Sequence, residues 1–336
     1  MKRQQPVSAS FRISPRVLGR LALNIQAIAA EQGLVLDQEA PPPLNGLFLQ
    51  RHAAAAGTPN RLLLYPGSFN PPHRGHEALL QHVLRVDTSL LGAVIVLTDD
   101  EKLANKNRHD HRPFLLTKAK RVSLWRGASS TLGPDRVWIF DGSEASWKAM
   151  RSSLQTRLAR DGFHLEFVLL TGPDVVTSRR ITDPSSWGCV ETITSDVSRP
   201  ADFRCVHSLR QLPRCTPWEP SSTETAKIRD PLGYPMTSAT ALWKCQTSRK
   251  PLRRYRFVAA EASAQGQAPS STEIRRVIAE LDGSQLKAEL ERLALNPTLL
   301  LRYASEGGPY SSPVVRDKKY EDHETRKAMV DEQAAW

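Results

Sequence analysis

Residues 67–76 combine side chains and a turn that suit a phosphate site. They read Gly-Ser-Phe-Asn-Pro-Pro-His-Arg-Gly-His and follow a short apolar run. His73 and His76 are three residues apart with Gly75 between them, so both imidazoles can face one ligand. A glycine turn that leads into a helix offers backbone N–H donors and the positive end of the helix dipole, which favour an anion. For the histidines and glycine alone, two surface histidines in a turn would be an equally good interpretation, but with the preceding Gly-Ser-Phe-Asn-Pro-Pro the segment predicts a phosphate-binding loop.

A second candidate phosphate contact lies far along the chain, where residues 270–276 read Ser-Ser-Thr-Glu-Ile-Arg-Arg. Serine and threonine at a helix start cap the first turn and offer hydroxyl and N–H donors, and Arg275 would add a planar guanidinium. A third segment, Gly-Pro-Asp at 172–174, follows another apolar run. Alone, the second segment is an ordinary helix cap and the third is a turn. The prediction therefore depends on the three occurring together in this order.

Together these segments resemble the motifs of the nucleotidylyltransferase superfamily, and within it those of the nicotinamide and nicotinate mononucleotide adenylyltransferases. Every position of 67–76 is compatible with the family pattern G-[GST]-[FT]-[DN]-P-x-H-x-G-H. Residues 270–275 are similar to its S-S-T-x-[IV]-R, and 172–174 to its G-[AST]-D. Two residues depart from the patterns: Pro173 fills the middle position of the third motif, and Pro269 stands where the family has an aliphatic residue.

The resemblance covers residues 61–200 and 255–303, and it implies a reaction. The phosphate of a mononucleotide attacks the α-phosphorus of ATP, giving a dinucleotide and pyrophosphate. A phosphate monoester has a second pKa of about 6 and is already an anion near neutral pH, so no general base is required. What is required is in-line positioning, with cationic or N–H groups around the triphosphate.

By the same resemblance, His73, His76 and Arg275 would be the catalytic residues and would stabilise the charge on the departing pyrophosphate. Trp187 would stack on the nicotinamide ring, and Arg199, within a Ser-Arg-Pro segment, would lie beside the pyridine nucleotide. Magnesium would be held mainly by the substrate phosphates, so no metal ligand is predicted among the side chains. The residues expected to bind ATP are Gly67, Ser68, Phe69, Asn70, Gly75, Lys106, Gly172, Asp174, Ser270, Ser271 and Thr272.

The elements that must position these residues follow from the hydrophobic pattern. Short apolar runs predict strands, and apolar residues recurring every three or four positions predict helices between them. This alternation predicts the α/β class, with a Rossmann-like doubly wound parallel sheet that the resemblance identifies as the nucleotidylyltransferase fold. Because each motif follows a strand or begins a helix, we expect all of them at the carboxyl edge of the sheet. The predicted strands are 61–65, 93–97, 137–140, 165–170, 189–194 and 255–258, and the predicted helices cover 79–84, 113–125, 147–158 and 274–301.

The chain reads as a single catalytic domain with additions. Residues 1–57 predict a helical N-terminal extension and linker, and 58–201 predict the Rossmann-like core. Residues 202–254 are rich in proline, serine and arginine and predict an inserted loop region. Residues 255–305 predict the end of the core with the C-terminal helices, and 306–336 predict a charged tail.

The composition limits the classes of function. Lysine and arginine number 46 against 35 aspartates and glutamates, and the formal net charge of +11 favours a polyanionic substrate. No apolar run approaches the roughly 20 residues of a membrane-spanning helix, so we expect a soluble protein without a membrane partner. The four cysteines form no C-x-x-C pair, which implies neither a zinc site nor a disulfide framework and favours a reducing compartment.

The N-terminus leaves the localisation open. The cytoplasm or nucleus is expected, but no acidic residue precedes Glu31 while arginines and serines are frequent, as in a mitochondrial transit peptide. The alternative is that Leu21, Ile25 and Ile28 form one face of a helix that docks on the domain.

Other functions remain open alternatives. A different acceptor would make the chain a pantetheine-phosphate adenylyltransferase or a cytidylyltransferase. A class I aminoacyl-tRNA synthetase would share the histidine motif, but it should also carry a K-M-S-K-S-like loop, which the sequence lacks. A catalytically weak relative that binds nucleotides or a partner is the third alternative. The expected ligands are ATP and nicotinamide or nicotinate mononucleotide, with no nucleic acid, and the sequence does not decide between amide and acid or the oligomeric state.

Overall fold

The computed structural model describes residues 20–36, 43–50, 59–127, 135–205, 208–221, 242–261 and 268–313. The first residues of the candidate transit peptide, the linker at 51–57 and the tail beyond residue 313 lie outside these ranges. Within them, one sheet has the strand order β3-β2-β1-β4-β5-β8-β7-β6. The strands are β1 (Asn60–Gly67), β2 (Leu90–Leu97), β3 (Val137–Phe140), β4 (Leu165–Leu170), β5 (Glu191–Ser195), β6 (Glu219–Pro220), β7 (Leu242–Gln246) and β8 (Arg254–Val258).

The strands from β3 to β8 in this order are parallel, and β1 lies at their centre. Leu64 of β1 pairs with Val94 of β2 on one side and with Leu169 of β4 on the other. The chain passes outward from β1 to β2 and β3, then returns to β4 on the opposite side of β1. The doubly wound α/β class predicted from the sequence is thus confirmed. Such folds bind ligands beyond the carboxyl ends of the strands where the order reverses, here β1 and β4.

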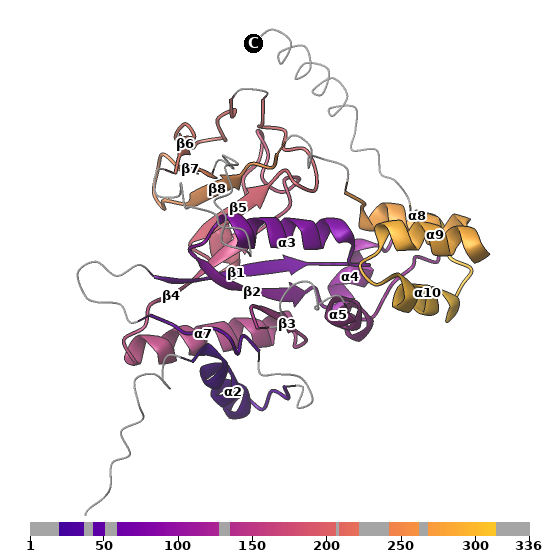
Figure 1. Ribbon diagram of the computed structural model, residues 1–336, viewed down its shortest axis with the longest axis horizontal. Helices are drawn as coiled ribbons and strands as arrows, with labels where there is room; N and C mark the ends of the chain where they lie inside the picture. The colour runs from indigo at the N-terminus through magenta and orange to yellow at the C-terminus, as the bar shows by residue number, and fades with distance from the viewer. Residues whose placement is uncertain are drawn as a thin grey trace, which may run out of the picture.

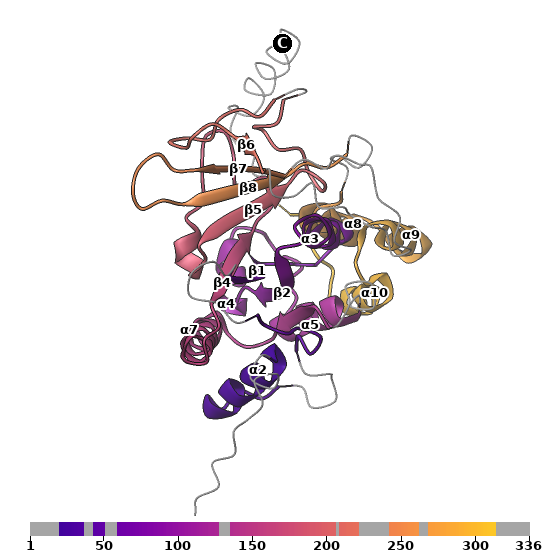
Figure 2. The same ribbon diagram turned by 60° about the vertical axis from the view of Figure 1, so that its left-hand side comes forward.

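The central strands are apolar on both faces because helices cover both. Figure 2 shows α3 (Arg74–Val86) and α5 (Lys118–Gly127) on one side of the sheet, and α7 (Glu144–Arg160) with α2 (Leu21–Glu31) on the other. Side chains alternate along β1 accordingly: Leu62 and Leu64 belong to the cluster under α7, whereas Leu63 and Tyr65 belong to the cluster under α3.

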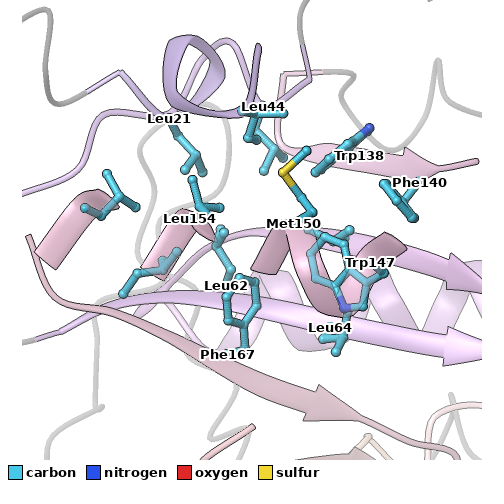
Figure 3. Packing of buried hydrophobic residues seen from close by; sticks show 14 of the residues in the cluster. Leu21, Leu44, Leu62, Leu64, Trp138, Phe140, Trp147, Met150, Leu154 and Phe167 are labelled. Atoms are coloured by element: carbon cyan, nitrogen blue, oxygen red, sulfur yellow. The ribbon is translucent and has the colours of Figure 1, made fainter. Parts of the chain in front are cut away.

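The core under α7 also holds the N-terminal helix. Trp147, Met150 and Leu154 of α7 pack toward Leu62, and Leu21 of α2 adds to the same cluster (Figure 3). Full burial of a large apolar side chain contributes about 1.5–3 kcal/mol. The apolar face of α2 is therefore used in docking on the domain, as one of the two interpretations of the N-terminus predicts.

A block of three helices follows the last strand, where the sequence pattern predicts one helical stretch over 274–301. The block consists of α8 (Ser271–Glu280), α9 (Gly283–Leu293) and α10 (Pro297–Ser305), separated by the N-cap residues Asp282 and Asn296. The three helices share a cluster of their own with Phe114 and Leu116. Figure 1 shows the arrow of β1 pointing toward the end of the molecule where this block lies.

Two other expectations are corrected. The described parts of 202–254, predicted as a loop region, contain β6 and β7, which pair antiparallel and extend the sheet beyond β8, so the sheet is mixed rather than wholly parallel. Phe203 and Trp218 stack at 5.5 Å beside Phe257 of β8 and give this region a core of its own. The helix predicted over 113–125 begins at Lys118.

Among the described residues, no helix has the length and apolar character needed to cross a bilayer. The four cysteines carry free thiols.

Candidate active site

A cleft of about 520 Å³ opens beyond the carboxyl ends of β1 and β4. Five segments form it: the loop after β1 with the start of α3, the segment after β4, the segment after β5, α4 (Asp100–Lys106) and the first turn of α8. All but two of the predicted site residues line it. The predicted residues that line the cleft are Gly67, Ser68, Phe69, Asn70, His73, Gly75, His76, Lys106, Gly172, Asp174, Arg199, Ser271, Thr272 and Arg275.

The loop after β1 turns sharply at Phe69, which has a left-handed φ of 46°. The Phe69 ring is buried and meets Tyr65 at 5.1 Å, His76 at 4.9 Å and Trp125 at 5.2 Å, each edge to face. A Cβ on Gly67 would lie 2.7 Å from this ring, so the position accepts only glycine. A left-handed non-glycine residue is strained and persists because its surroundings hold it, here by the aromatic contacts. The ring of Phe69 is therefore an anchor, and its backbone is the part that can face a ligand.

Asn70 is a clamp within the protein. Its side-chain amide donates to the carbonyl of Phe114 at 2.9 Å and accepts from the backbone N–H of Leu116 at 2.9 Å. Both groups lie in the segment that the sequence predicts as the start of a helix, whereas the helix begins only at Lys118. The side-chain N and O of Asn70 thus each have a partner within the protein, and its contact with ATP stays a prediction.

His73 and His76 stack with ring centroids 3.5 Å apart and planes inclined by 24°. The backbone N–H of His73 donates to Nδ1 of His76 at 3.2 Å, which assigns the proton of a neutral His76 to Nε2. The His73 ring is 3% exposed, and both of its nitrogens lack a partner among the described residues. The buried ring faces the cleft with its hydrogen-bonding capacity unused.

Both imidazoles are held neutral in this state. Burial and, secondarily, the positive charge of Arg199 lower the pKa of His73 from 6.5 to about 3. Burial, then His73 and Arg199, lower the pKa of His76 well below 6.5. At neutral pH the pair therefore offers N–H donors and no charge, until an anionic ligand changes the balance.

The positive charge in the cleft comes from longer side chains. Arg275 donates from Nη1 to the carbonyl of Asn70 at 2.8 Å and from Nη2 to Oγ1 of Thr272 at 3.3 Å. Lys106 Nζ lies 3.4 Å from Oγ of Ser68. Arg199 lies 3.8 Å from Asp174, and the two side chains are 40% and 48% exposed. The described lining residues thus include three cations and a single carboxylate, an excess of positive charge that favours a ligand with several phosphate charges.

The first turn of α8 is joined to the loop by hydrogen bonds. Ser271 Oγ donates to the carbonyl of Pro71 at 2.8 Å. Ser270 instead caps the helix: its hydroxyl accepts from the N–H of Glu273 at 3.0 Å, and the Glu273 carboxylate accepts from the N–H of Ser270 at 3.4 Å. Ser270 is one of the two predicted residues that do not line the cleft, because its hydroxyl is used in the capping box.

Trp187 is the other predicted residue that does not line the cleft. It ends a short 3₁₀ helix (Pro184–Trp187) just before β5 and packs, partly buried, against the core cluster under α7. The cleft lies beyond the carboxyl ends of the strands, whereas Trp187 precedes the amino end of β5 at Glu191. The structure therefore does not bring Trp187 to the cleft. The position of Trp187 could have been predicted from the strand expected at 189–194. A residue just before a parallel strand lies at the amino edge of the sheet, whereas the cleft lies at the carboxyl edge.

Sequence reasoning missed several lining residues. Tyr65, Leu103, Asn107, Val175 and Ser198 also face the cleft. Burial and the nearby negative charge of Asp174 raise the pKa of Tyr65, which keeps its phenol neutral. Ser198 belongs to the Ser-Arg-Pro segment of Arg199, whereas the other four belong to no motif and are placed here only by the pairing of strands with adjacent loops.

No family model matches the chain, and no curated protein does. Solved structures do match. Two are of nicotinic acid mononucleotide adenylyltransferase from Plasmodium falciparum, complexed with NaAD and with APC, at 13% and 12% identity and a TM-score of 0.39, covering 73% of this chain and 96% of that one. A putative nicotinate-nucleotide adenylyltransferase from Vibrio parahaemolyticus matches at 15% identity and a TM-score of 0.24, over 34% of this chain and 62% of that one.

Proposed function

We propose that this chain is an adenylyltransferase that transfers AMP from ATP to the phosphate of nicotinamide or nicotinate mononucleotide. One observation carries the proposal: three motifs far apart in the sequence line a single cleft at the point where the strand order reverses. Arg275 of the last motif donates to the carbonyl of Asn70 in the first at 2.8 Å, so the motifs are in direct contact.

The chemistry available in the cleft suits this reaction. A phosphate nucleophile needs no general base, and no residue is assigned that role. Neutral His73 and His76 would donate hydrogen bonds to the triphosphate, while Arg275 and Lys106 would supply charge to the departing pyrophosphate. The N-terminus of α3, which follows His73 directly, would add backbone N–H groups.

Magnesium would enter with ATP. The described residues contain no group of three or more side chains able to hold a metal, and Asp174 is the one carboxylate among those lining the cleft. This donor set suits a cation bound mainly by phosphate oxygens and water, which magnesium commonly accepts. The metal would neutralise charge on the triphosphate.

The acceptor side is supported by fewer residues. Arg199 would bind the mononucleotide, and Asp174 would bind the ribose of ATP. The two side chains lie 3.8 Å apart, so a single bound ligand could also reach both. Trp187 is not used in this proposal. Because Trp187 is not among the residues that line the cleft, a second candidate function is favoured, in which the same transfer is made to a phosphate acceptor without a pyridine ring, such as pantetheine phosphate.

The experiment is a set of parallel incubations of the purified protein with ATP and magnesium, following pyrophosphate release. The acceptors are nicotinamide mononucleotide, nicotinate mononucleotide and pantetheine phosphate, with ATP alone as the control for hydrolysis. Release that depends on a pyridine mononucleotide is expected. Release with pantetheine phosphate alone would favour the second candidate, and no release with any acceptor would contradict the proposal.

A further inference from the structure

Arg121 of α5 is a fully buried arginine with four hydrogen bonds, and no motif includes it. Its side chain is 0% exposed. Nε donates to the carbonyl of Leu116 at 3.1 Å, Nη1 to the carbonyl of Ser68 at 2.7 Å, and Nη2 to the carbonyl of Thr98 at 2.8 Å and to Asp100 Oδ1 at 2.7 Å. All three nitrogens of the guanidinium are thus in use.

Two of the four acceptors belong to segments that line the cleft. Ser68 is in the loop after β1, and Asp100 is in the first turn of α4, the helix that carries Lys106. Thr98 joins β2 to α4. Leu116 donates its own N–H to Asn70, so its peptide group links Arg121 to the clamp on the same loop. One side chain therefore connects the loop after β1 with α4, two of the segments that form the candidate triphosphate site.

The bond to Ser68 also sets the orientation of a peptide group. In a trans peptide the C=O and the following N–H point in opposite directions. With the Ser68 carbonyl directed at the buried guanidinium, the N–H of Phe69 is directed away from it. Phe69 is the residue with the left-handed φ of 46°, so Arg121 holds the turn at its most strained point.

The burial of the Arg121 guanidinium costs free energy, so its presence here calls for a physical explanation. An isolated buried charge is costly, and a well-packed apolar side chain of similar size is often neutral or better for stability. Burial lowers the pKa of Arg121, and the hydrogen bond and charge of Asp100 oppose that shift, so the guanidinium stays charged. A planar fork with donors in several fixed directions can hold three carbonyls and a carboxylate at once, which an ammonium cannot.

We propose that Arg121 is a positioning residue of the ATP site, which fixes the loop after β1 relative to α4 and so sets Ser68 and Lys106 side by side, 3.4 Å apart, at the cleft. This inference rests on the proposed function for the identity of the ligand. Arg121 does not touch the cleft itself, and its effect passes through the backbone of Ser68 and the first turn of α4.

The test compares Arg121→Lys and Asp100→Asn with the wild type by calorimetric titration of ATP with magnesium, in the absence of any acceptor. Arg126→Lys is the matched control, because Arg126 lies on the same helix, pairs with Asp141 at 2.9 Å and is 39% exposed. Asp100 is 53% exposed, so Asp100→Asn should fold even if the lysine variant proves unstable. Thermal unfolding of each variant identifies those that are folded at the titration temperature.

We expect the Kd for ATP to rise at least about tenfold in Arg121→Lys and less in Asp100→Asn, because small displacements of positioning groups have large effects. In turnover, the KM for ATP should rise and kcat fall while the KM of the acceptor stays within about twofold, a split that general loss of stability does not produce. The control should match the wild type. An ATP Kd within twofold of wild type in folded Arg121→Lys, or in Asp100→Asn if only that variant folds, would overturn the inference. A wild type that binds ATP without pyrophosphate release contradicts the proposed function alone, and a wild type that does not bind ATP contradicts both.

Discussion

The imidazoles of His73 and His76 lie face to face, 3.5 Å between centroids, and the backbone N–H of the first is bonded to Nδ1 of the second. Two imidazolium ions could not be held in this way, because their charges would repel and Nδ1 of His76 would lose its lone pair. The histidine motif therefore provides two neutral rings stacked at the start of α3. The cationic part of the site is left to Arg275, Arg199 and Lys106.

Replacing His76 with alanine should lower turnover by about 100-fold to 1000-fold, the loss seen when a donor to developing charge is removed. The free energy of unfolding should fall by only about 1 kcal/mol, because His76 also caps α3. Steady-state pyrophosphate release and urea unfolding measure the two effects. Gln81→Ala, on the exposed face of the same helix, is the control and should leave turnover unchanged. Turnover of His76→Ala close to wild type would remove the role assigned to this ring.

The stability of the fold should decrease as the pH falls below about 6.5. A histidine in the unfolded chain takes up a proton near pH 6.5, whereas folded His73 does so only near pH 3, so protons favour the unfolded state between these values. At pH 5 this one group should cost about 2 kcal/mol relative to pH 8. Urea unfolding of wild type and His73→Gln at both pH values isolates the contribution. Equal pH dependence in the two proteins would show that His73 is not held neutral.

Asn70→Ala should destabilise the protein by about 2–4 kcal/mol, because a buried N–H and a buried C=O each lose their partner. These groups belong to Leu116 and Phe114. Denaturant unfolding with an unchanged m-value is the measurement. A stability within about 0.5 kcal/mol of wild type, combined with weakened ATP binding, would instead make Asn70 a ligand contact.

Trp187→Ala and Arg199→Ala should separate structure from binding. Arg199 lines the cleft, and a hydrogen bond to a charged group contributes about 1.5–3 kcal/mol, so its loss should raise the acceptor KM about tenfold or more. Trp187 packs against the core under α7, so its loss should lower the melting temperature and leave the acceptor KM unchanged. Initial rates at varied acceptor concentration decide the matter. A raised acceptor KM in Trp187→Ala, with Arg199→Ala unaffected, would reverse this assignment.

Much of the fold could be predicted because its main signals are local. The runs at 137–140 and 165–170 become β3 and β4 with the same bounds, since strands covered on both faces must be continuously apolar. The sequence pattern did not predict β7, which pairs antiparallel with β8, because residues 242–246 are not continuously apolar and lie in a segment rich in proline, serine and arginine.

The residues of the site likewise divide into those that the sequence could predict and those that it could not. The motif residues could be found because their chemistry depends on residues at short, fixed spacings in the sequence. Their grouping could be predicted because the loops that follow parallel strands lie together at the carboxyl edge of the sheet. Arg121 could not be found, since an arginine in a helix gives no sign that it is buried. The clamp made by Asn70 could not be predicted because its partners, Phe114 and Leu116, lie outside its own motif.

The central claim is that one cleft holds a triphosphate between the stacked histidines and Arg275. A crystal structure of the complex with magnesium and an ATP analogue carrying a methylene group between the α- and β-phosphorus tests it most directly. We predict phosphate oxygens within hydrogen-bonding distance of His73 or His76 and of Arg275, with the α-phosphorus open to the side of Arg199. A triphosphate bound elsewhere on the protein, or bound in the cleft without contact to the histidines and Arg275, would contradict the account.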